Sequence, residues 1–281
     1  MQVNLSGKTA VVTGAGGILC SVMAKALAKA GAKVALLDLA LPKAQQFADE
    51  INADGGQAIA VEVNVLDPAS LKAAAAAVEA KFGPCDILVN GAGGNNPKGT
   101  TSKEYLEAAD LADGADPDVK TFFDLDPNGI AFVFGLNFNG TLLTTQAFAR
   151  GMAGRGGTII NISSMNAFTP LTKIPAYSAA KAAVSNFTRW LAVHFSKVGI
   201  RVNAIAPGFF LTAQNHALLV NPDGTPSARA KKILAHTPME RFGTPEDLTG
   251  ALLFLADAEA SSFVNGVVLP VDGAFSAYSG V

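Results

Sequence analysis

Short apolar runs alternate with alanine-rich stretches of helical length along most of the chain. The runs expected to form strands are residues 9–13, 34–37, 58–63, 86–89, 157–162, 200–205 and 266–270. The stretches expected to form helices are residues 22–30, 42–53, 68–82, 175–197 and 245–256. Nearly continuous apolar strands separated by helices are typical of a parallel sheet that is covered on both faces. No linker divides the chain, so the pattern predicts one α/β domain over residues 1–281 with seven parallel strands.

Two segments interrupt this alternation. Residues 93–129 are polar and rich in turn-forming residues, and residues 207–238 contain the turn cluster Asn-Pro-Asp-Gly-Thr-Pro between two short helix-like stretches. Long excursions from the carboxyl ends of parallel strands usually shape a ligand site. We therefore expect an insertion at 93–129 and a substrate lid at 207–238, although surface decoration explains either segment equally well.

The composition and charge argue against several classes of partner. With 49% hydrophobic and 16% charged residues, the chain of 281 residues has the composition of a folded protein. Its formal net charge of −2 gives no reason to expect a nucleic acid or an anionic membrane as a partner. No apolar stretch reaches the ~18 residues of a membrane span, and the start of the chain lacks a secretory signal pattern. The three histidines show no metal-ligand spacing. We expect a cytoplasmic protein without a metal site that acts on a small molecule.

A glycine-rich turn follows the first predicted strand and opens the first predicted helix. It contains Gly14, Gly16 and Gly17. Such a turn lets the backbone approach a pyrophosphate, which then lies at the positive N-terminus of the helix. Asp38 ends the next strand, about 20 residues further on, where a carboxylate accepts hydrogen bonds from a ribose diol. The combination predicts a dinucleotide site, and an ordinary turn role for Asp38 is the alternative.

Asp38 also favours NAD over NADP. A 2′-phosphate about 4 Å from the carboxylate would be repelled by roughly 4 kcal/mol at an effective dielectric of about 20. No arginine or lysine occurs in the glycine-rich turn or directly after Asp38 to offset this repulsion. NAD, as NAD(H), is therefore the expected cofactor.

Tyr177 and Lys181 are four residues apart near the start of a predicted helix and so share one face. On its own this pair is equally compatible with a solvated surface. However, Ser164 and residues 90–93 follow two predicted strands, whose carboxyl ends meet at the edge where α/β proteins bind ligands. A phenol beside a lysine and a positively charged nicotinamide should ionise more readily than usual, because nearby cations favour the phenolate. The residue types predict hydride transfer with NAD, with Tyr177 as proton shuttle and Ser164 orienting the substrate oxygen.

The sequence resembles the short-chain dehydrogenase/reductase family over nearly its whole length. The motifs that carry the resemblance occur in the family's order, and they are Thr13-Gly14 with Gly17, Asn90-Gly91-Ala92-Gly93, Asn137, Ser164, Tyr177 with Lys181, and Pro207-Gly208. The resemblance implies a single-domain Rossmann fold with seven parallel strands and helices on both faces, usually assembled as a homotetramer.

The resemblance also implies roles for individual residues. Tyr177 would be the general acid/base, and Lys181 would lower its pKa and hold the nicotinamide ribose. Ser164 would bind the reacting oxygen, and Asn137 would anchor a water in the proton relay. Cofactor contacts are expected from Gly14, Gly17, Ile18, Leu19, Asp38, Asn64, Val65, Asn90, Gly91, Ala92, Gly93, Tyr177, Lys181, Pro207, Gly208, Phe210 and Thr212.

Several loops look like the D-mannonate oxidoreductase (fructuronate reductase) subgroup of that family. These loops are residues 122–126, 163–168, 170–175, 206–210, 221–224 and 275–281. This similarity implies NAD(H)-dependent interconversion of D-mannonate and D-fructuronate. Substrate contacts are expected from Ser164, Asn166, Lys173, Asn95, Asn96 and Tyr177. Lys173 is the expected partner of the substrate carboxylate, and a solvated surface lysine is an equally good interpretation.

Three positions depart from the family pattern. The usual last glycine of the turn is Cys20, the usual acid near the end of the third strand is Asn64, and the usual second asparagine after the fourth strand is Gly91. A side chain at Cys20 is expected to push the first helix slightly away from the strand. Phe209 and Phe210 are expected either to wall the pocket or to pack under the lid.

Two other functions stay open. One is an NAD-dependent dehydrogenase for another sugar acid, a polyol or a ketoacyl thioester, for example of the gluconate 5-dehydrogenase type. The other is a non-catalytic nucleotide-sensing protein on the same fold. The presence of Ser164, Tyr177 and Lys181 disfavours the second.

Overall fold

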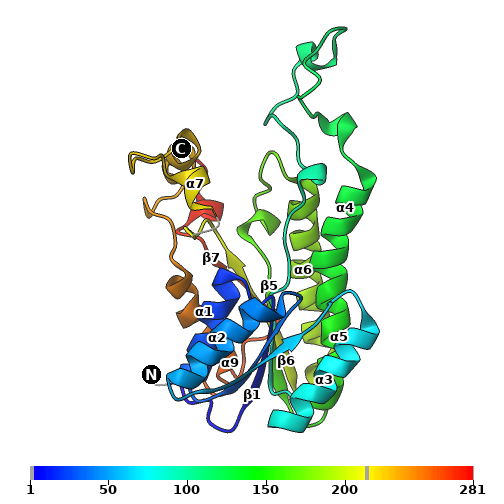
Figure 1. Ribbon diagram of the computed structural model, residues 1–281, viewed down its shortest axis with the longest axis vertical. Helices are drawn as coiled ribbons and strands as arrows, with labels where there is room; N and C mark the ends of the chain where they lie inside the picture. The colour runs from blue at the N-terminus through cyan, green and yellow to red at the C-terminus, as the bar shows by residue number, and fades with distance from the viewer. Residues whose placement is uncertain (1–2, 213–214, 281) are drawn as a thin grey trace.

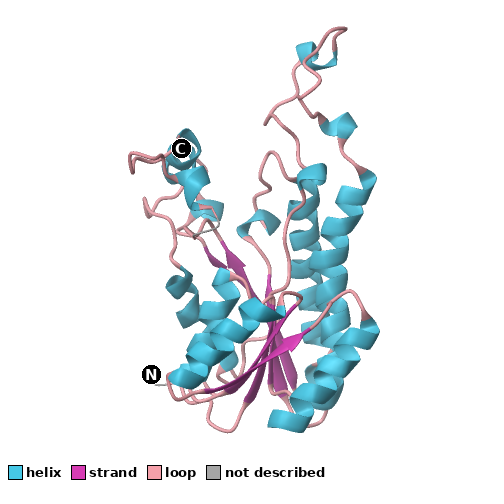
Figure 2. Cartoon of the chain, viewed as in Figure 1, coloured by secondary structure: helices cyan, strands magenta, loops and turns pink. Residues whose placement is uncertain are grey.

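The computed structural model describes residues 3–212 and 215–280, and its centre is a parallel sheet between two layers of helices (Figures 1 and 2). The strands in these residues are β1 Thr9–Thr13, β2 Lys33–Asp38, β3 Gln57–Glu62, β4 Ile87–Asn90, β5 Gly157–Ile162, β6 Ile200–Pro207 and β7 Val268–Val271. They lie in the order β3-β2-β1-β4-β5-β6-β7, and every neighbouring pair is parallel. The predicted seven-stranded parallel sheet is therefore confirmed, with strand ends within two residues of those expected.

The helices divide between the two faces of the sheet. Those on one face are α1 Ile18–Lys29, α2 Leu41–Ala53 and α9 Thr249–Ala256, and those on the other are α3 Pro68–Phe82, α5 Gly140–Met152 and α6 Pro175–His194. Successive residues of a strand point to opposite faces of the sheet and pack into the hydrophobic core on that face. Val12 packs with α1, and Val11 packs on the opposite face with α3 and α5. This double covering explains why the strands are apolar at nearly every position.

All five stretches predicted to be helical are helical in the structure, some with shifted ends. Helix α1 begins at Ile18, four residues before the expected start, because Gly17 is its N-cap. Helix α3 matches the predicted range, since Asp67 accepts a hydrogen bond from the Ala69 amide at 2.9 Å and Pro68 occupies the first turn. Helix α6 ends at His194, three residues before the predicted end.

One long helical element was not predicted. It starts as α4, Pro127–Phe134, passes through the π-helical segment Gly135–Asn139 and continues as α5. The Asp126 carboxylate begins it by accepting a hydrogen bond from the Asn128 amide at 2.8 Å. A π-helical turn breaks the regular periodicity of a helix and is frequent at functional sites.

The sheet order places a ligand crevice between β1 and β4. The chain leaves β1 toward β2 on one side and leaves β4 toward β5 on the other, so the connections diverge there. Ligands of open α/β sheets bind outside the carboxyl ends of the strands at such a switch point. The glycine-rich turn after β1, the turn after β4 and Ser164 after β5 therefore share one edge.

The two unusual segments flank this edge. The insertion, residues 93–129, contains short 3₁₀ helices at Pro97–Gly99, Ala108–Leu111 and Phe122–Asp124, and in Figure 1 it extends beyond α4. The segment 207–238 contains α7 His216–Leu219 and α8 Ala228–Ala235, so the two expected short helices are present. Its residues 213–214 lie outside the described part of the chain. Within the described residues, every helix is too short or too polar to cross a bilayer.

Candidate active site

The structure brings Ser164, Tyr177 and Lys181 together. Tyr177 and Lys181 lie in the first two turns of α6, with the Lys181 Nζ 5.6 Å from the centre of the Tyr177 ring. Ser164 follows β5 and begins a 3₁₀ helix, where its Oγ accepts a hydrogen bond from the Asn166 amide at 3.3 Å. The Ser164 side chain also lies close enough to Tyr177 to lower the pKa of the phenol. The phenol and the serine hydroxyl are thus placed to share one substrate oxygen.

Burial controls the ionisation of both titratable groups. It raises the pKa of Tyr177 from 10.0 to about 12, against a smaller lowering by the Ser164 side chain. It lowers the pKa of Lys181 from 10.5 to about 8. The Lys181 Nζ donates a hydrogen bond to the Ile162 carbonyl at 2.7 Å, inside the protein. In the protein alone, burial is the main influence on the pKa of the phenol. That Lys181 and a bound nicotinamide together lower this pKa stays a prediction.

Asn137 lies in the π-helical segment and is fully engaged with the backbone. Its Nδ2 donates to the Gly94 carbonyl at 2.7 Å and to the Val133 carbonyl at 2.8 Å, while its Oδ1 accepts from the Gly94 amide at 3.2 Å. A Cβ added to Gly93 would lie 2.6 Å from the Asn137 Oδ1 and 3.2 Å from the Lys181 Nζ. Asn137 thus ties the turn after β4 to the end of α4, and its role in holding a water stays a prediction.

The glycine-rich turn has the shape that a dinucleotide pyrophosphate needs. Gly14 has a φ of +67°, and a Cβ there would lie 2.9 Å from the Ala92 backbone, so a side chain is excluded on both grounds. Gly17 caps α1 without a side-chain hydrogen bond, and the first turn, which includes Ile18 and Leu19, holds no acid. The amides of this helix N-terminus stay available to a phosphate. The residues present therefore fit the predicted cofactor.

Asp38 shapes the same turn from the end of β2. Its Oδ2 accepts a hydrogen bond from the Gly16 amide at 2.9 Å, and its Oδ1 accepts one from the Ala40 amide at 2.8 Å. A Cβ added to Gly16 would lie 3.0 Å from both the Asp38 carboxyl and the Lys43 Cβ. Lys43 is thus a basic residue beside the predicted ribose site that the sequence interpretation missed. In the sequence, the only indication of this role is that a lysine occurs five positions after Asp38.

The predicted cofactor residues after β3 and β4 differ in burial and in their hydrogen bonds. Asn64 is exposed, and its Oδ1 accepts from the Leu66 amide at 3.0 Å, whereas Val65 is buried. The Asn90 side chain points into the protein, where its Nδ2 donates to Thr145 and Asn161, so only its backbone can border a ligand.

Two predicted nicotinamide neighbours follow β6. The Gly208 amide donates to the Val271 carbonyl at 2.9 Å, which continues the pairing of Pro207 with β7. The Thr212 amide donates to the Asn215 Oδ1 at 2.9 Å. These contacts hold the start of the segment 207–238 in place.

The predicted substrate residues differ in whether their side chains already have hydrogen-bond partners within the protein. Asn95 donates to the Thr100 hydroxyl at 3.0 Å, and the Asn96 Oδ1 caps the short helix at Lys98 at 2.9 Å, so both are engaged within the insertion. Asn166 is buried, and its Oδ1 has no hydrogen-bond partner among the described residues. Lys173 lies near Glu104, because its charge contributes to the lowered pKa of that carboxyl.

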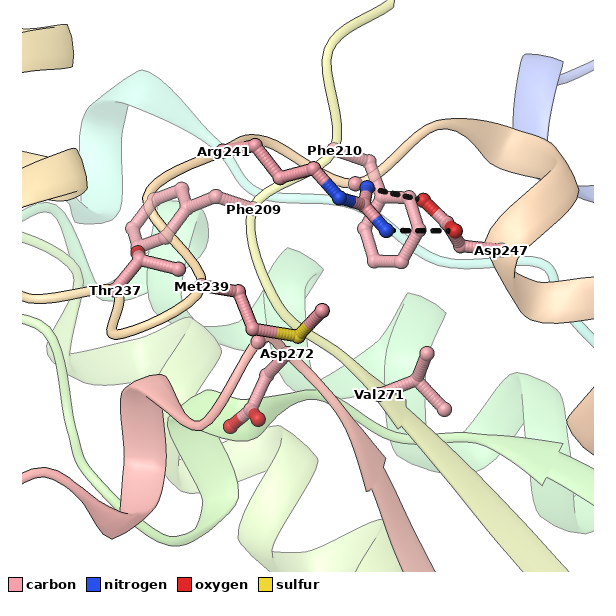
Figure 3. A pocket seen from close by; sticks show the side chains of 10 residues that line it. Phe209, Phe210, Thr237, Met239, Arg241, Asp247, Val271 and Asp272 are labelled. Atoms are coloured by element: carbon pink, nitrogen blue, oxygen red, sulfur yellow. Dashed lines mark hydrogen bonds and ion pairs between the residues drawn. The ribbon is translucent and has the colours of Figure 1, made fainter.

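Phe209 and Phe210 line a cavity of about 210 Å³ next to β7 (Figure 3). The Phe210 ring packs so closely on Gly243 that an added Cβ there would lie 2.7 Å away, and Phe209 stacks edge-on against Phe275. The ion pair between Arg241 and Asp247 forms another wall and lowers the pKa of Asp247 to about 2. The described residues that line this cavity include none of Ser164, Tyr177 and Lys181. Contact of Phe210 with the cofactor stays a prediction.

Comparison with known proteins settles the family. The family model described as short chain dehydrogenase matches residues 8–221. The chain belongs to the short-chain dehydrogenase family. It is therefore an oxidoreductase on the Rossmann-type fold. Among the described residues of this dehydrogenase, no group of three or more His, Cys, Asp or Glu side chains is arranged to hold a metal ion.

Individual relatives agree with this assignment. An uncharacterised oxidoreductase of Haemophilus influenzae is 61% identical over 279 residues, which are 99% of this dehydrogenase and 96% of the relative. A crystal structure of a proposed D-mannonate oxidoreductase from Haemophilus influenzae, with NAD bound, is 60% identical with a TM-score of 0.94 and covers 99% of this chain and 98% of that one. A proposed 2-deoxy-D-gluconate 3-dehydrogenase from Agrobacterium tumefaciens, with NADP bound, is 33% identical with a TM-score of 0.81, covering 98% and 99% of the two chains.

Proposed function

We propose that this dehydrogenase interconverts D-fructuronate and D-mannonate with NAD(H), and that Tyr177 is its general acid/base. The observation that carries the proposal is the convergence of Ser164, Tyr177 and Lys181 at the carboxyl edge of the sheet, beside the glycine-rich turn. The choice of substrate is supported by the 60% identity to the proposed D-mannonate oxidoreductase.

The proposed chemistry divides the work between cofactor and protein. NADH supplies a hydride to the keto carbon of the substrate. The Tyr177 hydroxyl donates a proton to the substrate oxygen, so the ketone becomes the secondary alcohol. The Ser164 hydroxyl hydrogen-bonds the same oxygen and orients it. With a pKa raised to about 12, Tyr177 keeps its proton near neutral pH, as a proton donor to the substrate oxygen requires.

We assign the cofactor site to the glycine-rich turn, the turn after β4 and the loop after β6. In this proposal Gly14 and Gly17 face the pyrophosphate, Asp38 accepts hydrogen bonds from the ribose, and Lys181 holds the nicotinamide ribose. The carboxylate of Asp38 is the reason to expect NAD ahead of NADP. The lid role of residues 207–238, the homotetramer and the cytoplasmic location stay predictions.

The substrate carboxylate is assigned to Lys173. The backbone of this residue is held by a hydrogen bond from the Thr101 amide at 3.0 Å, which ties the loop before α6 to the insertion. Asn166 is the second proposed contact, because its buried Oδ1 lacks a partner among the described residues and can accept from a substrate hydroxyl.

The direct test is the loss of NADH absorbance with D-fructuronate, 5-ketogluconate or fructose as substrate. The proposal predicts the highest kcat/KM for D-fructuronate, and turnover of all three substrates slowed by about 10²–10⁴ in Tyr177→Phe. Preference for 5-ketogluconate would instead establish the aldonate reductase alternative. Binding of NADH without turnover of any ketone, in wild type and variant alike, would overturn the catalytic role of Tyr177.

A further inference from the structure

Cys20 and Gly91 occupy complementary spaces between α1 and the turn after β4. A Cβ added to Gly91 would lie 2.3 Å from the Cys20 Sγ and 2.8 Å from the Thr13 carbonyl oxygen. Cys20 itself is buried. The thiol thus fills the volume that any side chain at position 91 would need. Glycine at position 91 makes room for the thiol. A displacement of α1 from the strand by Cys20 stays a prediction.

The contact belongs to a set that joins two turns. The Thr13 Oγ1 accepts hydrogen bonds from the Gly91 amide at 3.1 Å and from the Ala92 amide at 3.2 Å. Gly14 approaches the Ala92 backbone so closely that an added Cβ would lie 2.9 Å away. The Cys20 thiol adds the contact from the helix side. All of these contacts fix how the glycine-rich turn lies against the turn after β4.

We propose that Cys20 is a positioning residue that, through its contact with Gly91, sets the spacing of the two turns that hold the cofactor. This inference rests on the proposed function, because it assigns both turns to the cofactor. It gives the thiol a packing role, as a small apolar group in a close-packed interior. Burial raises the pKa of Cys20 from 9.0 to about 12, so the group is a neutral thiol near neutral pH, as a packing role requires.

A double-mutant cycle with Gly91→Ala, Cys20→Ala and the combined variant tests this coupling. Cys20→Ala is the matched change, because it removes the Sγ and keeps a Cβ that would lie 3.7 Å from the new Cβ at position 91. Each protein is titrated with NADH by the fluorescence of the nucleotide, and its thermal unfolding is measured without nucleotide. Contacting residues couple by about 0.5–3 kcal/mol, which corresponds to a factor of about 2 to 150 in Kd.

We expect Gly91→Ala to raise the Kd for NADH about tenfold, because the new methyl group separates the turns. Adding Cys20→Ala to that variant should lower its Kd for NADH again by at least about threefold. Recovery should be incomplete, because the Thr13 carbonyl oxygen would still lie 2.8 Å from the new Cβ. Gly151→Ala is the control, since a Cβ at Gly151 meets nothing within 4 Å.

Three outcomes overturn the inference. The first is an equal loss of NADH affinity from Gly91→Ala in the wild-type and Cys20→Ala backgrounds. The second is coupling in thermal unfolding without coupling in the Kd, which would leave Cys20 a structural residue only. The third is an unchanged Kd in Gly91→Ala. Failure of the wild-type protein to bind NADH is a separate result, because it would refute the proposed function, while the unfolding cycle would still report the contact.

Discussion

The carboxylate of Glu104 and the ammonium group of Lys232 form an ion pair that joins the insertion to helix α8. The two residues are far apart in the sequence, and each lies in one of the two segments that flank the candidate active site. Lys173, from the loop before α6, adds a weaker electrostatic contribution to the same carboxylate. Electrostatic interactions thus connect three segments that leave the carboxyl edge of the sheet: the insertion, the loop before α6 and helix α8. These interactions hold the insertion against the other two segments.

Breaking this ion pair should loosen the insertion without unfolding the protein. Glu104→Gln removes the charge from a partly exposed pair, so we expect Tm to change by no more than about 2 °C. Hydrogen exchange in residues 97–125 and 228–235 should speed up severalfold, because the local opening loses a restraint. Glu107→Gln is the matched control, since Glu107 pairs with Lys103 inside the insertion. Unchanged exchange in α8 would show that the pair does not restrain the two segments.

The same pair predicts a pH dependence. Lys232, and to a smaller extent Lys173, hold the pKa of Glu104 below its usual value of 4.5. A carboxyl group with a lowered pKa contributes stability that is present above its usual pKa and is lost as the pH falls through the lowered one. After correction for intrinsic rates, the difference in exchange between wild type and Glu104→Gln should therefore be large at pH 6 and shrink progressively as the pH falls below the usual carboxyl pKa of 4.5. A difference that persists in acid would assign the protection to another contact.

The sequence predicted the sheet well because its strands are buried on both faces. The run 34–37 is apolar at every position, and a parallel strand covered on both sides favours that pattern. The same reasoning failed for α4 and α5. Their helix passes through the π-helical segment Gly135–Asn139, where the periodicity is interrupted, and it follows a polar insertion that obscures its start at Asp126. The motif at Asn137 was identified, but the helix around it was not.

The sequence predicted those site residues whose positions follow from a strand end or from the spacing along a helix. Ser164, Tyr177 and Lys181 were found because strand ends and helix spacing determine their positions. The ionisation of Tyr177 was not, because burial depends on tertiary packing that no local pattern encodes. The accommodation of Cys20 by Gly91 was also hidden, since the two residues are 71 positions apart and meet only in the folded chain.

Replacing Tyr177 by phenylalanine should separate chemistry from binding. The change removes the proton donor and keeps the ring, so kcat for ketone reduction should fall by about 10²–10⁴. The Kd for NADH should stay within about twofold, because the hydroxyl is directed at the substrate oxygen in the proposed arrangement. Stopped-flow turnover and nucleotide fluorescence measure the two effects. Tyr105→Phe is the matched control, since Tyr105 is exposed in the insertion. A variant with near-normal kcat would remove Tyr177 from its proposed role.

The buried amine of Lys181 should make stability depend on pH. Its pKa falls from the usual 10.5 to about 8 in the folded protein, so between these values the unfolded chain holds a proton that the folded protein has released. The free energy of unfolding therefore gains up to about 1.4 kcal/mol per pH unit from this group as the pH rises. Lys181→Met lacks this contribution, so the variant should be more stable than wild type at pH 7, and its advantage should shrink toward pH 9.5. Urea denaturation at several pH values measures the difference, and an advantage that is constant with pH would contradict the low pKa.

The choice between NAD and NADP should depend on the balance of Asp38 and Lys43. Asp38→Ala removes a carboxylate that would repel a 2′-phosphate by roughly 4 kcal/mol at most, so the preference for NADH over NADPH should fall by about 10- to 100-fold in kcat/KM. Part of that loss should also appear with NADH, because the Asp38 carboxylate holds the Gly16 amide at 2.9 Å. Lys43 lies beside the same turn, and its ammonium group would attract a phosphate once the carboxylate is gone. Adding Lys43→Ala to Asp38→Ala should therefore weaken NADPH use again while leaving NADH use nearly constant. Wild-type preference for NADPH, or an Asp38→Ala variant with unchanged discrimination, would show that another group selects the cofactor.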